Sequence, residues 1–495
     1  MENLPTKARP FYPLAAAFFV SAAILSYIQF AAPNIPDHDG YYHIKMAELI
    51  RTSGLPTPFP YLPFTILDEK GYTDHHMLLH VIQVPFTFLK DLRFAAKLSA
   101  IFCSAIAFAT FFWLLRSFRI PYPWLWLVLL FASSSAFLYR MSMPRAPSLS
   151  LAFQFIAFYF IIKRHFKSLA LLCLIFVWTY NAFPTVVALA LIGTLVFLVT
   201  ERRFEYKILL ASGIGIAAGL VINPYFPRDI LFLWNHIVPK IFAAKYQTSV
   251  GSEWYPYRTW SLLTLSPVAV SSYIAGLFFS NREEWKSDTP KLFWFLTASM
   301  YLLLLLKSRR FVEYFPPSAI VFLAFATRNL LANTSFESVM RTVTGKIGIF
   351  TGTVVLSMFL ATAIIQVRQV IRDAQESVAY KAGAEWLAQN TPPGSIVFNT
   401  DWDDFPMLFH YNTHNRYIVG LDADFLRLKN EQLFREYERI TRGKVDDPAD
   451  LILKDFHSQF VITDQRHKDF IKKAEKSKRF KKRFSDKYTI VYEIL

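Results

Sequence analysis

The sequence contains only two cysteines, Cys103 and Cys173, and both lie within apolar segments. Cysteines in such positions behave as small buried hydrophobic residues, so we expect neither a disulfide nor a thiolate metal site. The chain also lacks a Gly-rich loop of the kind that cradles nucleotide phosphates, and it lacks a nucleic-acid-binding motif. These absences argue against a nucleotide-bound substrate and against a nucleic-acid partner.

Charged residues are few as well. They make up 18% of the 495 residues, compared with about 25% in soluble domains, while 54% are apolar. The uncharged run 14–32 is long enough to cross a hydrocarbon core of roughly 30 Å. Many similar runs follow, and no clear small-residue cleavage site is present, so we interpret 14–32 as a membrane span and not as a cleaved signal.

The hydropathy pattern predicts a mainly α fold, a polytopic bundle of about eleven transmembrane helices. Helices are required because the bilayer core offers backbone groups no water. The expected spans are 14–32, 94–115, 121–139, 148–162, 168–183, 184–200, 207–223, 260–280, 290–306, 311–327 and 346–366.

The basic residues predict the orientation of this bundle. The net charge of +16 is typical of membrane proteins whose cytoplasmic loops carry Lys and Arg. Lys7 and Arg9 precede the first span, and basic clusters follow the second, fourth and sixth. We therefore expect a cytoplasmic N-terminus and, after eleven spans, an extracytoplasmic tail. The many spans and the absence of a cleaved leader lead us to expect a location in a prokaryotic inner membrane.

Two domains are expected. Residues 1–366 form the transmembrane domain, with long extracytoplasmic loops at 33–93 and 224–259, and residues 367–495 form a small soluble α/β domain. In this domain we expect a helix at 374–389 and strands at 395–399, 417–419, 460–463 and 488–495. The basic stretch 472–487 is interpreted as a solvated face, with anionic lipid headgroups as the alternative contact.

The first candidate site directly follows the first span. It contains Asp37, His38, Asp39 and His43, which are costly near lipid unless they bind something. Carboxylates suit hard divalent ions such as Mg²⁺ or Mn²⁺, and His43 lies one helical turn beyond Asp39. The alternative is that Asp37 or Asp39 merely caps a helix.

A second candidate cluster, Asp74, His75, His76 and His80, closes the same loop. Histidines in such a position can hold a metal, position a phosphate or shuttle protons. An exposed helix start is the alternative interpretation.

The other two candidates lie later in the chain. Glu253, beside Trp254, could supply a metal ligand or a general base. Arg309 and Arg310 stand at the extracytoplasmic end of a span, where cations are normally avoided, and guanidinium groups bind phosphate bidentately. Snorkelling side chains are the alternative. Acids, a metal and phosphate-binding cations on one membrane face predict transfer from a lipid-linked phosphate donor.

These residues resemble those of the polytopic GT-C glycosyltransferases, and in particular the catalytic subunit of oligosaccharyltransferases. Asp39-Gly40-Tyr41 is similar to the first acidic motif, Ser252-Glu253 to the loop motif, and Arg309-Arg310-Phe311 to the Arg motif. Asn390-Thr391-Pro392-Pro393 and 401–405 resemble the start of the family's soluble domain and its Trp-Trp-Asp motif. The resemblance implies the GT-C fold and a catalytic metal held by Asp39 and Glu253.

The residue patterns and the resemblance together give the expected site roles. Asp39 and Glu253 would be catalytic, and the metal ligands would be Asp37, Asp39, His43 and Glu253. The donor phosphate would meet Arg145, Arg309, Arg310, His75 and His76. Trp254, Trp402 and Asp403 would form the acceptor site.

Two departures from the family pattern stand out. Only Trp402 and Asp403 match the motif Trp-Trp-Asp-Tyr-Gly, which reads an Asn acceptor in that family. The segment 140–145 should carry a second acidic pair, yet it contains no acid. Histidines of the first loop could compensate, the metal could be weakly held or absent, or Arg145 could replace the cation.

Our leading hypothesis is a glycosyltransferase that uses a polyprenyl phosphate or pyrophosphate sugar. Its partners would be membrane lipids, the lipid-linked donor and a protein, lipid or glycan acceptor. One alternative is a polyprenyl-monophosphate-dependent transferase acting on a lipid or polysaccharide. The other is a non-catalytic lipid-glycan binder or transporter, which the sparse charge within the spans disfavours.

Overall fold

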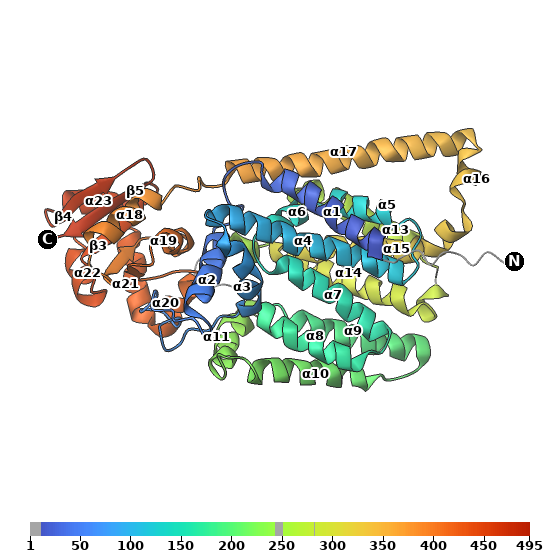
Figure 1. Ribbon diagram of the computed structural model, residues 1–495, viewed down its shortest axis with the longest axis horizontal. Coiled ribbons are helices and arrows are strands. Elements are labelled where there is room, and N and C mark those ends of the chain that lie inside the picture. The colour runs from blue at the N-terminus through green and yellow to red at the C-terminus, as the bar shows by residue number, and fades with distance from the viewer. Residues whose placement is uncertain (1–10, 243–250, 282) are drawn as a thin grey trace. The chain divides into compact units, whose positions relative to one another are not determined.

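The computed structural model describes residues 11–242, 251–281 and 283–495. The chain forms two compact units, and neither is continuous in sequence (Figure 1). The first, the helical unit, takes its described residues from 1–32, 97–219 and 252–373. The second, the mixed unit, takes its described residues from 33–96, 220–251 and 374–495.

The helical unit is built from long apolar helices joined by short turns. Its α-helices are α1 (Phe11–Gln29), α4 (Leu92–Ser117, which begins in the mixed unit), α5 (Pro123–Ala132), α6 (Ser135–Ser142), α7 (Pro147–Ile162), α8 (Phe166–Thr179), α9 (Pro184–Glu201), α10 (Tyr206–Val221), α12 (Thr259–Leu265), α13 (Pro267–Phe278), α14 (Thr289–Lys307), α15 (Phe315–Asn333), α16 (Phe336–Met340) and α17 (Val343–Asp373). Three short 3₁₀ turns, η2 (Ser252–Trp254), η3 (Glu284–Lys286) and η4 (Arg309–Glu313), lie between them.

Every one of the eleven expected spans is helical. Among the described residues, six helices are long and apolar enough to cross a membrane, or up to eight if each of two bent pairs is one span. The remaining three, α7, α8 and α10, are apolar helices of 16, 14 and 16 residues. The chain is thus a multi-pass membrane protein, and the count of eleven stays a prediction.

Two of the expected spans are sharply bent. The helices α5 and α6 meet at 91°, and α12 and α13 meet at 88°. Ser134 caps α6 by accepting the Phe137 N–H, and its hydroxyl also bonds the Ser266 hydroxyl at 2.7 Å. The two breaks therefore satisfy each other's polar groups inside the bundle, which backbone irregularity at this depth requires.

Small residues set one of the helix contacts. A Cβ atom at Gly215 of α10 would lie 2.1 Å from the carbonyl oxygen of Ala170 on α8, and one at Gly219 would lie 2.9 Å from Val177 Cβ. The Trp178 indole donates to the Gly219 carbonyl at 2.8 Å. Glycine at both positions allows the close approach that drives helix association in lipid.

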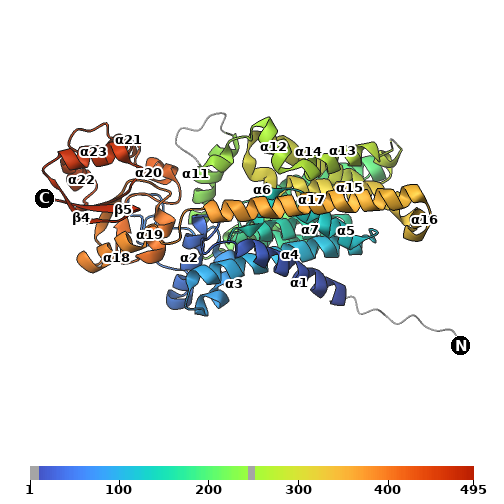
Figure 2. The same cartoon turned by 90° about the horizontal axis from the view of Figure 1, so that it is seen from above.

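The helix α17 lies beside α5 and α6 over part of its length (Figure 2). Only 6% of its most apolar 18-residue stretch is buried, and the helix exposes Val343, Phe350 and Met358. An exposed apolar helix of 31 residues is what contact with lipid allows and contact with water does not.

The mixed unit combines a five-stranded sheet with short helices. Its first helices are α2 (Asp39–Ser53), α3 (Met77–Gln83), the 3₁₀ turn η1 (Val84–Phe88) and α11 (Arg228–Phe242). The tail adds α18 (Lys381–Asn390), β1 (Ile396–Asn399), α19 (Phe405–Tyr411), β2 (Arg416–Tyr417), α20 (Ala423–Lys429), α21 (Glu431–Thr441), α22 (Ala449–Asp455), β3 (Phe460–Asp464), α23 (Lys468–Lys476), β4 (Phe480–Ser485) and β5 (Thr489–Ile494).

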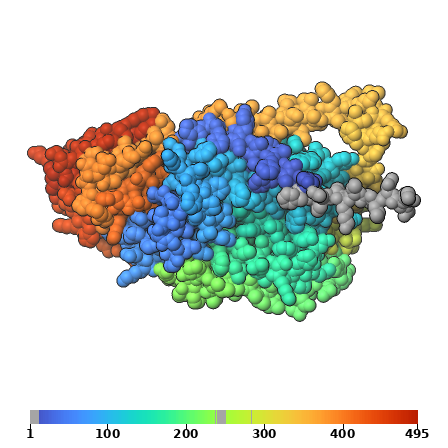
Figure 3. Space-filling view, viewed as in Figure 1, coloured from blue at the N-terminus to red at the C-terminus, as the bar shows by residue number. Residues whose placement is uncertain are grey.

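The strand order is β2-β1-β3-β5-β4. The strand β1 pairs in parallel with both β2 and β3, whereas β5 is antiparallel to β3 and β4. An apolar core that includes Phe398, Tyr437, Val461 and Phe470 lies between the sheet and its helices. The strands and helices of the tail form one continuous surface, orange to red in Figure 3.

Two features of this part of the chain add to the expectations from the sequence. The basic stretch 472–487 contains the strand β4, whose exposed Lys and Arg side chains mark it as an edge strand. Most of the loops 33–93 and 224–259 group with the tail and not with the transmembrane domain. The physical reason is aromatic packing, because Phe59 contacts Phe409 at 5.7 Å and the Tyr417 N–H donates to the Tyr61 carbonyl.

Candidate functional site

A chain of alternating charges lies in the helical unit where α6, η2 and η4 meet. Arg140 of α6 donates from Nη1 to Oε2 of Glu253 at 2.6 Å. Arg310 of η4 donates from Nη1 to the other oxygen, Oε1, at 3.1 Å. Both oxygens of Glu253 are thus held by guanidinium groups, and such charge-assisted bonds are among the strong hydrogen bonds of proteins.

Arg140 is also bound on its other edge. Its Nε donates to Oε1 of Glu313 at 2.7 Å, and its Nη2 donates to the same oxygen. The Glu313 side chain is fully buried, and its Oε2 atom has no hydrogen-bond partner within the described part of the chain. A buried guanidinium between two carboxylates is stable only because it is paired on both sides.

Arg310 is enclosed by aromatic rings. Its guanidinium carbon lies 5.0 Å from the centre of the Trp254 ring and 5.7 Å from that of Tyr180. Its Nη2 donates to the Tyr180 hydroxyl. Cation–π contacts and the Glu253 pair therefore fix the plane of this guanidinium.

The segment that carries Glu253 is anchored through its backbone as well. The Ser308 hydroxyl donates to the Glu253 carbonyl at 2.8 Å, and the Arg309 N–H donates to the Tyr255 carbonyl at 3.0 Å. Arg309 also donates from Nε to the Pro256 carbonyl at 3.1 Å. The sequence predicted Arg309 as a phosphate contact, and the structure gives it this anchoring role in addition.

The arginines control the charge of Glu253. Burial would raise the pKa of Glu253, but the positive charges of Arg140, Arg310 and Arg145 outweigh it and hold the pKa well below its usual range. Burial would lower the pKa of Arg310, but the nearby Tyr180 and Glu253 outweigh it, so that the pKa of Arg310 lies above its usual value. The carboxylate and the guanidinium both stay charged at any physiological pH.

The predicted cluster at Asp39 lies in the mixed unit, so the structure does not test its predicted convergence with Glu253. Asp39 opens α2, and Gly54 ends that helix at a positive φ of 79°. His38, just before the helix, pairs from Nδ1 with Asp403 Oδ2 at 3.3 Å. Burial alone would lower the pKa of His38, but Asp403, with help from Asp37, raises it to about 9.

A second relay of polar groups lies behind α2. His80 Nδ1 contacts Asp74 Oδ2 at 2.7 Å, and His80 Nε2 contacts His43 Nδ1 at 2.7 Å. A carboxylate oxygen accepts, so in a neutral His80 the Nδ1–H donates to Asp74, and Nε2 accepts from Nδ1–H of His43. The two histidine-bearing clusters predicted separately from the sequence are therefore one hydrogen-bonded group.

The other two histidines of the loop, His75 and His76, lie in a group of aromatic rings. The His75 ring lies 4.7 Å from Phe232 of α11 and 4.1 Å from His76. His76 in turn meets His43 edge-on at 4.9 Å. Their predicted role at the donor phosphate stays a prediction.

Two of the three predicted acceptor residues, Trp402 and Asp403, lie in the tail, whereas Trp254 lies in the helical unit against Arg310. Trp402 packs against the core of the mixed unit, and Asp403 pairs with His38. The buried Asp404 accepts from the Tyr380 hydroxyl, and burial holds the pKa of Asp404 well above its usual value. The motif thus has a structural function in this chain beside any acceptor role.

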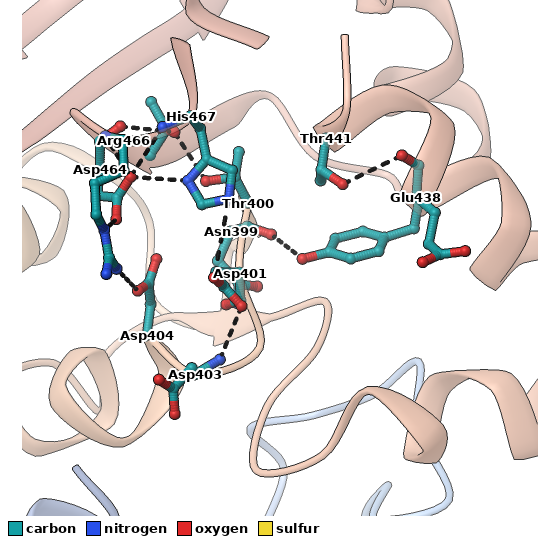
Figure 4. A network of polar contacts seen from close by, with 12 residues as sticks. Asn399, Thr400, Asp401, Asp403, Asp404, Glu438, Thr441, Asp464, Arg466 and His467 are labelled. Atoms are coloured by element: carbon teal, nitrogen blue, oxygen red, sulfur yellow. Dashed lines mark hydrogen bonds and ion pairs between the residues drawn. The ribbon is translucent and has the colours of Figure 1, made fainter. Parts of the chain in front are cut away.

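A polar network surrounds the motif (Figure 4). His467 contacts Asp464 Oδ1 at 2.8 Å and Asp401 Oδ2 at 3.9 Å, and Arg466 bridges Asp464 and Asp404. Histidine and arginine after β3 thereby compensate three carboxylates, which would otherwise repel one another.

No metal site is assembled among the described residues of either unit. No group of three or more His, Cys, Asp or Glu side chains in that part of the chain could hold a metal ion. The expected ligands Asp37, Asp39 and His43 lie in the mixed unit, where His43 is bonded to His80. Glu253 lies in the helical unit, between two guanidinium groups.

Sequence reasoning missed two members of the site. Arg140 is predicted only as part of a segment without acids, and Glu313 is not among the predicted site residues. Glu313 stands inside the expected span 311–327, and an ionisable residue at that depth signals a buried partner. That signal, with Arg140 at the end of another span, could have paired the two.

The fold and the site together define a polytopic membrane protein with buried guanidinium–carboxylate pairs and a small α/β domain. No protein-family model matches the sequence, and no curated protein matches it. Solved structures do match.

The archaeal oligosaccharyltransferase AglB from Archaeoglobus fulgidus, in complex with an inhibitory peptide and a dolichol-phosphate, has a TM-score of 0.65 and 12% identity over 92% of this chain and 70% of that chain. ArnT from Cupriavidus metallidurans, bound to undecaprenyl phosphate, has a TM-score of 0.60 and 13% identity over 97% of both chains. Both are GT-C glycosyltransferases. The chain therefore has the GT-C-like membrane fold that its motifs predicted.

Proposed function

We propose that this protein is a membrane glycosyltransferase that moves a sugar or oligosaccharide from a polyprenyl phosphate or pyrophosphate carrier to an acceptor on the extracytoplasmic face. The observation that carries the proposal is the guanidinium of Arg310, held by Glu253 and enclosed by Trp254 and Tyr180. A fixed guanidinium at the end of a membrane helix suits a phosphate whose lipid tail stays in the bilayer.

Each site residue has a proposed role. Arg310, with Arg145 and Arg309, would stabilise the negative charge that develops on the departing phosphate. Asp39 would act on the acceptor as a base, and Glu253 would hold the two arginines in place. His75 and His76 would add polar contacts to the donor, and Trp254, Trp402 and Asp403 would contribute to acceptor binding.

The two solved structures support the donor class. AglB was solved with a dolichol-phosphate and ArnT with undecaprenyl phosphate, and both share the fold of this chain. An extracytoplasmic tail, which follows from the positive-inside rule, and a prokaryotic inner membrane belong to the same proposal.

A second candidate is a transferase that takes its sugar from a polyprenyl monophosphate and modifies a lipid or polysaccharide. Two observations favour it. The match to ArnT covers 97% of both chains, and the motif 401–405 keeps only Trp402 and Asp403 of the pattern that reads an Asn acceptor.

The test is transfer of a labelled sugar from a synthetic polyprenyl-phosphate donor to cell-envelope acceptors by the purified full chain. We expect Arg310→Gln and Asp39→Asn each to lower the rate on the order of 100-fold, because each loses a charge that acts in the transition state. Arg341→Gln is the matched control, since Arg341 is exposed and forms a surface ion pair with Glu337, four residues earlier. Full activity of both site variants would refute the proposal.

The acceptor is identified by comparing the glycans, glycolipids and glycoproteins of cells with and without the gene by mass spectrometry. Loss of a glycan from protein supports an oligosaccharyltransferase, and loss from a lipid or polysaccharide supports the second candidate.

A further inference from the structure

We infer that Glu253 is not a metal ligand in this protein, and that Arg140 and Arg310 supply beside it the positive charge that a divalent cation would otherwise bring.

Both carboxylate oxygens of Glu253 are already bonded to guanidinium groups. Oε2 receives Arg140 Nη1 at 2.6 Å and Oε1 receives Arg310 Nη1 at 3.1 Å. A divalent cation binds carboxylate oxygens at about 2.0–2.6 Å. It would therefore have to displace one of these guanidinium groups or lie in contact with two full positive charges.

The charges of the buried group around Glu253 are already balanced. The buried group contains two guanidinium ions, Arg140 and Arg310, and two carboxylates, Glu253 and Glu313. Their formal charges cancel. A metal site needs an excess of negative charge to repay the ion's dehydration, and this group has none to offer.

Arg140 is fixed in position by its hydrogen bonds to both glutamates. Its side chain uses Nε, Nη1 and Nη2, so that one planar group joins Glu313 to Glu253. Only 9% of the side chain is exposed. Because Glu313 is fully buried and has no other ion pair among the described residues, Arg140 cannot leave Glu253 without leaving a buried carboxylate uncompensated.

The sequence agrees with this assignment. The segment 140–145 contains Arg140 and Arg145 and no acid, and both arginines act on the charge of Glu253. An arginine in place of an acid replaces a group that attracts a metal cation by one that itself carries a positive charge. The consequence for the donor rests on the proposed function: guanidinium groups neutralise its phosphate.

The first experiment measures Mn²⁺ binding to the purified full chain by electron paramagnetic resonance. We expect wild type and Glu253→Gln to bind the same number of ions with the same affinity, so that any site at Asp37 and Asp39 cancels in the comparison. One ion fewer in Glu253→Gln would overturn the inference.

A second measurement leaves Glu253 intact and so remains valid if the Gln variant does not fold. A nitroxide is attached to Ser252→Cys, since Ser252 is exposed and both native cysteines are buried. We expect Mn²⁺ to leave the relaxation of this label unchanged. Strong relaxation enhancement that persists in Asp39→Asn would place an ion at Glu253 and refute the inference.

The third measurement is binding of undecaprenyl phosphate in detergent, with EDTA or with MgCl₂. We expect the same Kd within twofold in both, and at least tenfold weaker binding by Arg310→Gln but not by Arg341→Gln. Binding that EDTA abolishes and Mn²⁺ restores would contradict the inference. If no variant and no condition gives binding, the proposed donor is wrong, while the Mn²⁺ results still decide the role of Glu253.

Discussion

Arg140 donates from Nε to Oε1 of Glu313 at 2.7 Å, across 173 residues of sequence. The pair joins the end of one bent span to the start of another helix, and it is almost fully enclosed by the bundle. Because Arg140 also bonds to Glu253, the position of the buried Glu313 affects the position of Glu253 in the candidate site.

Replacing Glu313 by Gln should destabilise the helical unit by about 3–5 kcal/mol, because Arg140 would remain buried with half of its compensation gone. The check is the loss of a native fluorescence signal on heating in detergent. Glu337→Gln removes an exposed partner of Arg341 and should change stability by less than about 0.5 kcal/mol. Equal melting temperatures for the two variants would contradict the importance of the Arg140 pair.

Tyr180→Phe should weaken binding of a polyprenyl phosphate by about 5-fold, since Arg310 loses one neutral hydrogen-bond partner worth about 1 kcal/mol. The ring, and with it the cation–π contact, is kept. Tyr273→Phe is a matched control, because its hydroxyl bonds Ser299 in the same bundle. If both variants bind as wild type does, the Tyr180 hydroxyl does not orient Arg310.

The His38–Asp403 pair predicts a pH-dependent stability of the mixed unit. The pKa of His38 rises from 6.5 to about 9 on folding, so the folded state binds the proton more tightly than the unfolded state. The stabilisation is therefore complete below about pH 6.5 and is lost as the pH rises toward 9. We expect about 1 kcal/mol, because Asp403 is half exposed and solvent weakens the pair.

This prediction is checked by thermal unfolding of wild type and His38→Gln from pH 6 to 10. The difference between the two proteins should shrink across this window. A difference that is constant with pH would show that the pair contributes no proton-linked stability.

Asp74→Asn should disturb the tautomers of His80 and His43 as well as stability. The amide can present its N–H to His80 Nδ1, which would move the His80 proton to Nε2 and reverse the direction of its hydrogen bond to His43. We expect a loss of about 1–3 kcal/mol, since the group is buried. The ¹⁵N chemical shifts of the two imidazoles report the tautomers directly.

Asp91→Asn is the control for this experiment, since the Asp91 side chain is half exposed and pairs with Arg93. Unchanged imidazole shifts in Asp74→Asn would mean that Asp74 does not set the proton positions.

The elements of the fold were predictable because their causes are local. Apolar runs near twenty residues require helices in lipid, and all eleven expected segments are helical. Alternating β-branched and aromatic residues marked β1, β3 and β5 in the tail. The edge strand β4 was missed because its exposed Lys and Arg side chains give it the composition of a solvated loop.

The sequence by itself determined the membrane class, the helical segments, the α/β tail and the residue types that bear charge near the membrane surface, because each depends on hydropathy or on a short motif. Only the tertiary structure decided the partners: that Arg140 lies between Glu253 and Glu313, that His80 links Asp74 to His43, and that Asp403 meets His38. The physical reason is that a buried charge must be compensated, whereas the compensating residue can come from any segment that the packing of helices brings near it.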